Sequence, residues 1–284
     1  MSRKVAIVAD STSGLTDDLL KQYHIFPSYL MIIFEHDSYK EFKELSPERF
    51  VELSNAQKEL PSTSQPSIGE TVENYQNILK EGYDEIIHLT ISSTLSGSYA
   101  SAVSAAEMVD ASKIHLFDTK TVAYPQGALT IEAATMANDG KSAEEILARL
   151  AELQSQIALV GAIYDMTNLR KGGRITPIAA SLGNMLQIKP VIMIMPDGSL
   201  QPIAKVRTFK KALDALIEQV KEANLDESKD QICVLHLENP EAAAQLKEKI
   251  LNIYPTIDIV EVPISLVVAI HVGPGIAAIG WIRR

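Results

Sequence analysis

The sequence is poor in several residue types, and each scarcity excludes a class of protein. The 284 residues contain a single cysteine, which excludes disulfide bonds within the chain. This residue, Cys233, lies in the apolar run QICVLHL, which favours a buried small hydrophobe over a catalytic thiol. The 26 Lys and Arg are outnumbered by 36 Asp and Glu, giving a formal net charge of -10. This acidic balance argues against nucleic acid as the primary partner.

Long hydrophobic runs and metal-binding motifs are also missing. The longest apolar stretch, residues 259–282, is interrupted by Glu261, Pro263, His271 and Pro274 before it reaches about 20 residues, so we interpret it as core strand and turn. The apolar part of the N-terminus is too short for a signal peptide, which predicts a cytoplasmic protein. None of the six histidines forms an i, i+4 pair and HExxH is absent, so we predict no metal site.

The first half of the chain alternates β-branched apolar runs with helical patterns, which is typical of an α/β fold with a largely parallel sheet. The predicted strands of a first sheet are residues 4–10, 27–34, 84–91 and 112–118. The predicted helices, each with Ser, Thr or Asp near its start, are residues 16–23, 67–82, 96–109 and 142–154.

The second half continues the alternation but contains a hairpin signal. Asp197-Gly198 lies between two apolar runs and predicts a turn between antiparallel strands in residues 188–207. The other predicted elements are strands 157–165, 231–237 and 257–263 and helices 208–223, 240–253 and about Thr176 to Met185. We therefore predict an α/β protein of two domains, residues 1–160 on a parallel sheet and residues 161–284 on a mixed sheet.

Three turns rich in hydroxyl groups follow predicted strands or precede predicted helices: VADSTSG (8–14), LPSTSQPSIGE (60–70) and ISSTLSGS (91–98). Ligands of parallel α/β sheets bind beyond the carboxyl ends of the strands, so we expect these turns to converge on one pocket. A helix starting near Ser96 would place its hydroxyl beside the N–H groups of Gly97 and Ser98, which suits an anionic group. No lysine stands in this turn, which disfavours a basic phosphate cradle.

Each of these residues also has an ordinary structural interpretation. Ser93 and its neighbours are common in turns, and Asp10 and Ser11 are capping residues by default. Ser67 is followed three residues later by Glu70, as in a capping box. For any one residue alone, this interpretation is the stronger one.

A hydrolase is the alternative function. Ser96, His271 and Asp10 could nominally supply a nucleophile, a base and an orienting carboxylate, although Ser96 lies in T-L-S-G-S and not in G-x-S-x-G. His271 precedes the rigid Val-Gly-Pro-Gly turn within an apolar run, so it needs a hydrogen-bond partner, either a ligand or a core group. The remaining histidines are interpreted as surface or strand residues: His24, His36, His88, His115 and His236.

A basic segment, NLRKGGRITPIAASLGNMLQIKP (168–190), stands out in this acidic protein. Arg170, Lys171 and Arg174 surround two glycines just before a predicted helix. The segment is either a solvated loop or a docking patch for a phosphate-bearing ligand or an acidic partner.

The order of these motifs resembles a known family. VADSTSGL, STSQPS, SSTLSGSY, LRKGGRI, IKPVIMIMPDGSL, KVRTFKKAL and HVGPGI follow one another from about residue 4 to the end of the chain. In this order they resemble the DegV family, whose studied members are the fatty-acid-binding subunits of bacterial fatty-acid kinase.

The resemblance implies a ligand and a site. One long-chain fatty acid would be buried at the junction of the two domains, and the late HVGPG segment would return to it. The family's carboxylate-binding residues match Thr63, Ser96 and His271, with Ser93 and Gly97 as further neighbours in the same turn. The ligand would be a fatty acid, with no cofactor.

The resemblance also implies a partner. A separate ATP-using kinase would form the acyl-phosphate that feeds phospholipid synthesis, so the chain itself would not be an enzyme. Arg170 and Arg174 are candidates for the edge that faces the kinase or the phosphate. Transient membrane contact would fit such a carrier, and the alternative remains a serine hydrolase acting on a lipid-like ester.

Overall fold

The computed structural model describes residues 3–57, 59–174 and 188–283, so the helix predicted from Thr176 to Met185 lies outside the described residues. The chain divides into two compact units. Unit 1 comprises Met1–Ser155 and Ser265–Val267, and unit 2 comprises Gln156–Ile264 and Val268–Arg284. The chain divides after Ser155, whereas the sequence prediction placed the boundary after residue 160.

Unit 1 is built on a four-stranded parallel sheet in the order β2-β1-β6-β7. Its strands are β1 (Val5–Asp10), β2 (Ile25–Ser28), β6 (Glu85–Thr90) and β7 (Ile114–Asp118). Every residue of β1 and of β6 is buried. These strands read as continuous apolar runs because helices cover both faces of the sheet.

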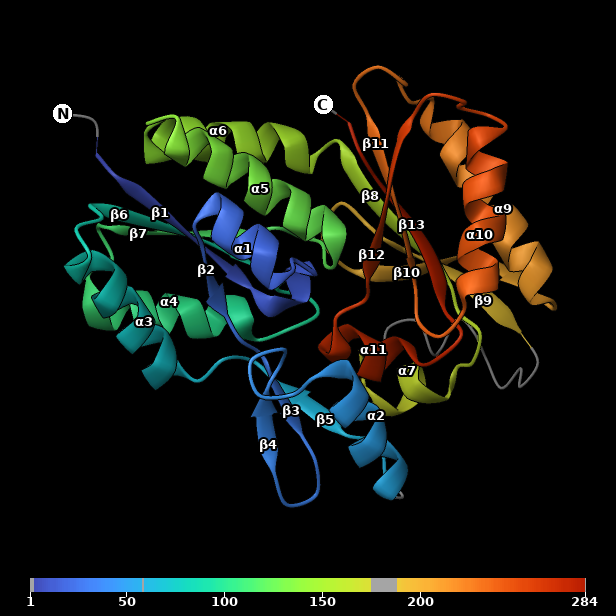
Figure 1. The fold of residues 1–284 in the computed structure, drawn as a ribbon, viewed down its shortest axis with the longest axis horizontal. Coiled ribbons are helices and arrows are strands. Elements are labelled where there is room, and N and C mark those ends of the chain that lie inside the picture. Colours follow the sequence, from blue (N-terminus) through green and yellow to red (C-terminus); the bar gives the residue numbers. More distant parts are fainter. Residues whose placement is uncertain (1–2, 58, 175–187, 284) are drawn as a thin grey trace. The chain divides into compact units, whose positions relative to one another are not determined.

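Helices α3 and α4 lie on one face of this sheet, and α1, α5 and α6 lie on the other (Figure 1). Their bounds are α1 (Asp17–Tyr23), α3 (Ile68–Lys80), α4 (Ser98–Val109), α5 (Tyr124–Asn138) and α6 (Ala143–Gln154). Thr16, Ser67 and Ser142 cap α1, α3 and α6 by accepting a backbone N–H bond, which confirms the predicted helix starts. The Ser67 bond comes from the Glu70 N–H, at 3.2 Å.

A second, antiparallel sheet of unit 1 corrects one prediction. Residues 27–34 were expected to form a single strand of the first sheet, but β2 ends at Ser28 and β3 (Met31–Ile33) pairs with other strands. The N–H of Leu30 donates to the Ser11 hydroxyl at 3.1 Å, so the chain leaves the parallel sheet at this point. The remaining elements here are β4 (Ser38–Lys40), β5 (Ser62–Ser64), α2 (Pro47–Ala56) and the 3-10 turn η1 (Ser11–Ser13).

Unit 2 is built on a six-stranded mixed sheet in the order β10-β9-β8-β13-β11-β12. Its strands are β8 (Ile157–Ala162), β9 (Lys189–Ile194), β10 (Leu200–Val206), β11 (Gln231–His236), β12 (Asp258–Pro263) and β13 (Ala277–Ile282). β9 and β10 form the antiparallel hairpin predicted from Asp197-Gly198. β11 and β12 pair in parallel.

The helices of unit 2 are α7 (Thr167–Lys171), α9 (Phe209–Ala223) and α10 (Pro240–Leu251), and α11 (Leu266–Val272) begins in unit 1 and ends in unit 2. Apolar residues of α9 and α10, such as Leu216 and Leu246, pack with the strands in one core. The parallel sheet of unit 1 and the mixed sheet of unit 2 confirm the predicted fold class.

The interpretation of residues 259–282 as strand and turn alone was wrong, because α11 separates β12 from β13. The apolar positions of its seven residues continue those of the neighbouring strands, so no change of period marks the helix. Over the described part of the chain, no helix combines the length and the apolarity that crossing a membrane requires.

Candidate functional site

The hydroxyl-rich turn after β6 is held by backbone bonds at the carboxyl edge of the parallel sheet. The N–H of Ser92 donates to the carbonyl of Thr121 at 2.9 Å, and the N–H of Ser96 donates back to the carbonyl of Ser92 at 3.1 Å. The hydroxyl of Ser93 donates to the Asp118 carboxylate at 2.6 Å, and its N–H donates to the same group at 3.1 Å. Ser93 therefore ties the turn to the end of β7.

Helix α4 begins two residues later than predicted, at Ser98. Gly97 is the N-cap residue, and the Ser96 hydroxyl accepts the N–H of Ser98 at 3.2 Å. The Ser96 oxygen thus accepts a hydrogen bond from the first N–H of α4, while its O–H proton can be donated to a ligand. The side chain of Ser98 is 2% exposed, and its hydroxyl has no hydrogen-bond partner among the described residues. The hydroxyl of Thr90, at the end of β6, is also buried without a hydrogen-bond partner among the described residues.

The turn that carries Thr63 lies beside the turn that carries Ser96. A Cβ added to Gly97 would lie 3.2 Å from the side-chain amide of Gln65, so these two residues are in close contact. The hydroxyl of Ser101, in the first turn of α4, donates to the carbonyl of Pro66 at 3.1 Å. Thr63 is half-buried on β5. The structure thus brings these two predicted turns together within unit 1. The third predicted turn, residues 8–14, contacts the 91–98 turn through Asp10, which accepts the N–H of Ile91.

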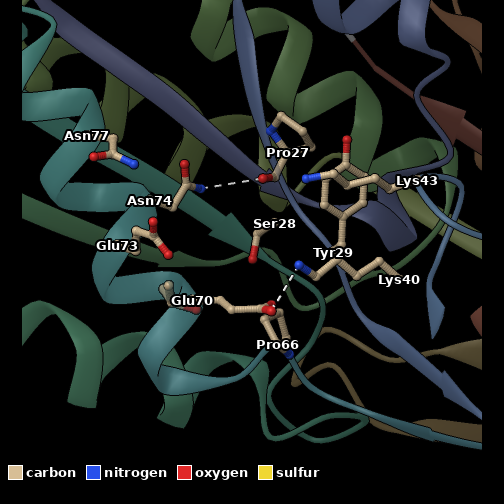
Figure 2. A pocket seen from close by; sticks show the side chains of 11 residues that line it. Pro27, Ser28, Tyr29, Lys40, Lys43, Pro66, Glu70, Glu73, Asn74 and Asn77 are labelled. Carbon is tan, nitrogen blue, oxygen red and sulfur yellow. Dashed lines mark hydrogen bonds and ion pairs between the residues drawn. The ribbon is translucent and has the colours of Figure 1, made fainter. Parts of the chain in front are cut away.

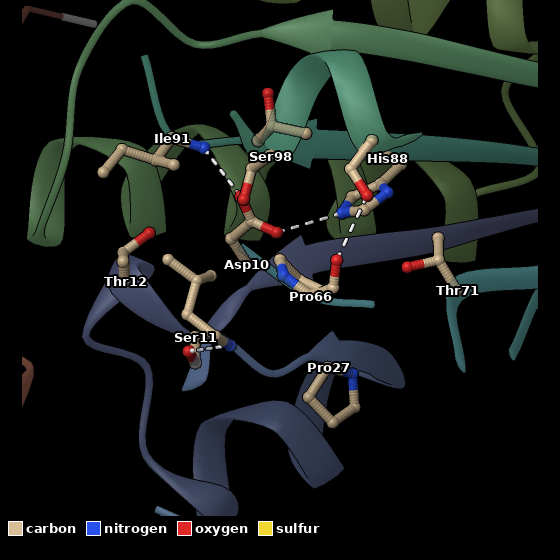
Figure 3. Close-up of polar contacts among 12 residues, drawn as sticks. Asp10, Ser11, Thr12, Pro27, Pro66, Thr71, His88, Ile91 and Ser98 are labelled. Atoms are coloured by element: carbon tan, nitrogen blue, oxygen red, sulfur yellow. Dashed lines mark hydrogen bonds and ion pairs between the residues drawn. The ribbon is translucent and has the colours of Figure 1, made fainter. Parts of the chain in front are cut away.

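A buried chain of polar groups lies at the same edge of the sheet. Asp10 Oδ1 is 3.3 Å from His88 Nε2, and His88 Nδ1 is 2.6 Å from the Tyr75 hydroxyl. The second oxygen of Asp10 accepts the N–H of Ile91 at 3.0 Å, directly before the turn (Figure 3). Asp10, His88 and Tyr75 are all at most 1% exposed. Burial of the Tyr75 hydroxyl raises its pKa, with the Asp10 charge as a second cause, so it remains a protonated donor.

This network corrects one interpretation and confirms another. Asp10 makes no helix-capping bond, because both of its oxygens are used by His88 and Ile91. His88 is a strand residue, as interpreted from the sequence, and its ring also links β6 to β1 and α3 through Asp10 and Tyr75. Asp10 therefore orients His88 within unit 1, and this arrangement gives the hydrolase alternative no support.

In unit 2, His271 lies near the end of α11 beside α7. The amide of Asn168 donates to the carbonyl of Ile270 at 2.9 Å, and a Cβ added to Gly172 would lie 2.5 Å from His271 Nδ1. Burial lowers the pKa of His271 to about 4, and the charge of Arg174 contributes in the same direction. The imidazole is therefore neutral near pH 7, where its N–H can donate to a carboxylate oxygen without forming an ion pair.

The basic side chains that precede residue 175 in this segment, Arg170, Lys171 and Arg174, are exposed. Arg170 and Lys171 end α7, and the Arg174 guanidinium donates to the carbonyl of Gly172 at 2.8 Å. This bond keeps Arg174 close to the backbone that contacts His271. Cys233 is fully buried, and burial raises the pKa of its thiol to about 12, which confirms its interpretation as a core residue.

Outside these turns we considered a pocket beside Pro66 and possible metal-binding groups. A pocket of about 320 Å³ beside Pro66 has walls of both charges, with Lys40 bound to Glu70 at 2.9 Å and Asn74 bound to the carbonyl of Pro27 at 3.4 Å (Figure 2). Within the described residues, no group of three or more His, Cys, Asp and Glu side chains could hold a metal ion.

Similarity to known proteins shows the family to which this chain belongs. A family model described as "Uncharacterised protein, DegV family" matches residues 4–284. The chain belongs to the DegV family. Protein DegV of Bacillus subtilis (strain 168) is 32% identical over 281 residues, 98% of each chain.

Solved structures of other DegV family members have the same fold. The crystal structure of DegV, a fatty acid binding protein from Bacillus subtilis, has a TM-score of 0.89, 31% identity and full coverage of both chains. A fatty acid binding DegV family protein from Streptococcus agalactiae has a TM-score of 0.90 and 29% identity, over 99% of each chain. A structure concerning fatty acid binding of a DegV family protein from Thermus thermophilus has a TM-score of 0.90 at 26% identity, over 99% of this chain and 100% of that one.

The sequence singled out Ser96, Gly97 and Thr63 as candidates, but it missed the residues that contact their turns. Gln65 lies within the STSQPS motif and Asp118 ends a predicted strand, so both lie next to segments that the sequence singled out. Tyr75 and His88 lie in apolar helical and strand patterns, where nothing in the sequence distinguishes a bonded polar group from an ordinary core residue.

Proposed function

We propose that this protein binds a long-chain fatty acid and presents the carboxylate of that ligand to a separate ATP-dependent kinase. The observation that carries the proposal is the full-length similarity to DegV structures described as fatty acid binding, at TM-scores of 0.89 and 0.90. The acyl-phosphate formed by the kinase would feed phospholipid synthesis, and the chain itself would be a carrier in the cytoplasm.

The carboxylate is assigned to Thr63, Ser96, Gly97 and His271, with Ser93 at the edge of the site. The hydroxyl of Ser96 and the start of α4 offer donors to an anion without a full positive charge. The contacts of Gly97 with Gln65 and of Ser101 with Pro66 support a shared site for the two turns of unit 1. A neutral His271 adds a further donor at neutral pH.

The energetics favour tight retention of such a ligand. Each buried methylene contributes about 0.8 kcal/mol, so a chain of about sixteen carbons gains on the order of 10 kcal/mol before ordering costs are subtracted. Arg170 and Arg174, which are exposed, are assigned to the edge that meets the kinase or the phosphate.

The test is mass spectrometry of the purified protein, with denaturing analysis of organic extracts and native analysis of the intact complex. We expect about one fatty acid per chain in the wild type and a marked loss of it in Thr63→Val and Ser96→Ala. Both variants should remain folded, because Thr63 and Ser96 are only partly buried. Acyl-phosphate formation with an added fatty-acid kinase should fall in parallel.

The matched controls are Thr135→Val and Ser104→Ala, which remove helix hydroxyls that, within the described part of the chain, bond to the backbone of their own helix. Full retention of fatty acid by the Thr63 and Ser96 variants would refute the carboxylate assignment. A protein that is empty when purified and does not take up added fatty acid would refute the function itself.

A further inference from the structure

A buried carboxylate in unit 1 has no role in the site described so far. Glu41 is 0% exposed, and its two oxygens accept bonds from different parts of the chain. One oxygen accepts the hydroxyl of Ser11 at 2.5 Å, and the other accepts the N–H of Val267 at 2.9 Å. The hydroxyl of Ser265 and the N–H of Leu266 also bond to this carboxylate.

Three of these four donors belong to one short segment, Ser265–Val267, at the start of α11. The first N–H groups of a helix have no partner within the helix and need an acceptor from outside. Glu41 supplies this acceptor. Burial raises the pKa of Glu41, while these hydrogen bonds oppose the shift by stabilising the charged form.

The other end of α11 carries His271. Asn168 and Gly172 contact this end, through the carbonyl of Ile270 and through His271 itself. An α-helix rises about 1.5 Å and turns about 100° per residue, so a change in its first turn alters both the height and the direction of a side chain five residues later. α11 has only seven residues, about two turns, so losing the first turn would leave a single turn that is not stable by itself.

We propose that Glu41 is a positioning residue for His271. By accepting the hydrogen bonds of the first turn of α11, it fixes the helix that presents the imidazole. The consequence for fatty-acid binding rests on the proposed function, because His271 is assigned there to the carboxylate site. The positioning itself does not depend on the ligand, so the two can be tested separately.

The test compares Glu41→Gln with the wild type by NMR titration of the histidine ring protons, with His271 assigned from the signal lost in His271→Asn. In the wild type, His271 should titrate with a pKa of about 4. In Glu41→Gln, the loosened helix should admit water to the ring, so the midpoint should rise by about one pH unit or more. The rate at which bound fatty acid exchanges should rise about tenfold. This is the effect expected from losing roughly one charge-assisted hydrogen bond, here the bond from His271 to the fatty-acid carboxylate.

The matched control is Glu85→Gln. Glu85 is also a buried carboxylate of unit 1, at 8% exposure, but it bonds to His115 at 3.1 Å at the opposite end of the sheet. This variant should leave the His271 titration unchanged. Ser265→Ala removes one donor to Glu41 and should shift the titration in the same direction by a smaller amount, so it serves as a second variant if Glu41→Gln does not fold.

A His271 titration that is unchanged in both folded Glu41→Gln and folded Ser265→Ala would overturn the positioning role. A shifted titration with unaltered fatty-acid retention would support the positioning role and overturn the assignment of His271 to the carboxylate site. An equal shift in Glu85→Gln would show a general loosening of the protein and would also overturn the proposal.

Discussion

Removing the hydroxyl of Tyr75 tests the buried network at the edge of the unit 1 sheet. In Tyr75→Phe the shape of the side chain is kept, but His88 Nδ1 loses the group that lies 2.6 Å away. Because Tyr75 and His88 are 0% and 1% exposed, water has no access to replace the lost partner. Leaving a buried polar atom without a hydrogen bond costs about 1–3 kcal/mol of stability.

For a protein of this size, 1 kcal/mol corresponds to roughly 2–4 °C in Tm, so we expect Tm to fall by about 4–8 °C. The free energy of unfolding in urea should fall by about 2 kcal/mol. Tyr83→Phe is the matched control, since the Tyr83 ring packs edge-on against Phe26 at 5.5 Å and its hydroxyl has no bond among the described residues. The control should change the stability by less than about 0.5 kcal/mol.

Hydrogen exchange adds a local measurement. His88 also contacts Asp10, which accepts the N–H of Ile91, so loosening the ring should speed exchange of the Ile91 amide. Equal stability of Tyr75→Phe and Tyr83→Phe, together with unchanged exchange at Ile91, would refute the idea that this network holds the turn.

The remaining predictions concern His271. Gly172→Ala should weaken fatty-acid retention, because the new Cβ would lie 2.5 Å from His271 Nδ1, whereas Gly69→Ala, with nothing within 4 Å, should retain the fatty acid when both are measured by native mass spectrometry. The folded-state pKa of His271, about 4, lies below its usual value of 6.5, so the neutral form stabilises the fold. This stability is present above about pH 6.5 and is lost as pH falls toward 4, by up to about 3 kcal/mol. Urea unfolding should therefore depend less on pH between 4 and 7 in His271→Asn, and identical pH dependence of the two proteins would contradict this explanation.

The elements of unit 1 that could be predicted are those with a clear period and a capping residue. Thr16, Ser67 and Ser142 marked helix starts correctly because a cap is a local interaction among neighbouring residues. The buried strands β1 and β6 were recognisable as continuous apolar runs, for a similar reason.

The failures occurred where contacts distant in sequence decide the local structure. Ser28 ends β2 early because Leu30 bonds to Ser11, and nothing within residues 27–34 encodes that contact. α11 was missed because Glu41, 226 residues away from Val267, supplies its N-terminal acceptor. A seven-residue helix whose cap lies so far away has no signature in its own sequence.

In the candidate site, too, local features were predictable from the sequence and contacts between distant segments were not. The sequence identified the turns by their hydroxyl groups and correctly placed residues 8–14 and 91–98 after β1 and β6, but residues 62–64 form strand β5 of the second sheet. It did not reveal that Asp118 binds the Ser93 hydroxyl or that Gln65 contacts Gly97. Such pairings depend on strand order in the sheet, which periodicity does not specify.

The contribution of Ser265–Val267 to unit 1 has a consequence for folding during synthesis. The ribosome synthesises residues 156–264 between Ser155 and the segment Ser265–Val267. At usual elongation rates this separates the two parts of unit 1 by about 5–20 s. During this interval the Glu41 carboxylate has Ser11 as a donor but lacks the donors of α11. A fragment ending at residue 155 should therefore remain less stable than the same residues within the complete chain, and the final step of folding the N-terminal unit awaits the C-terminal end of the protein.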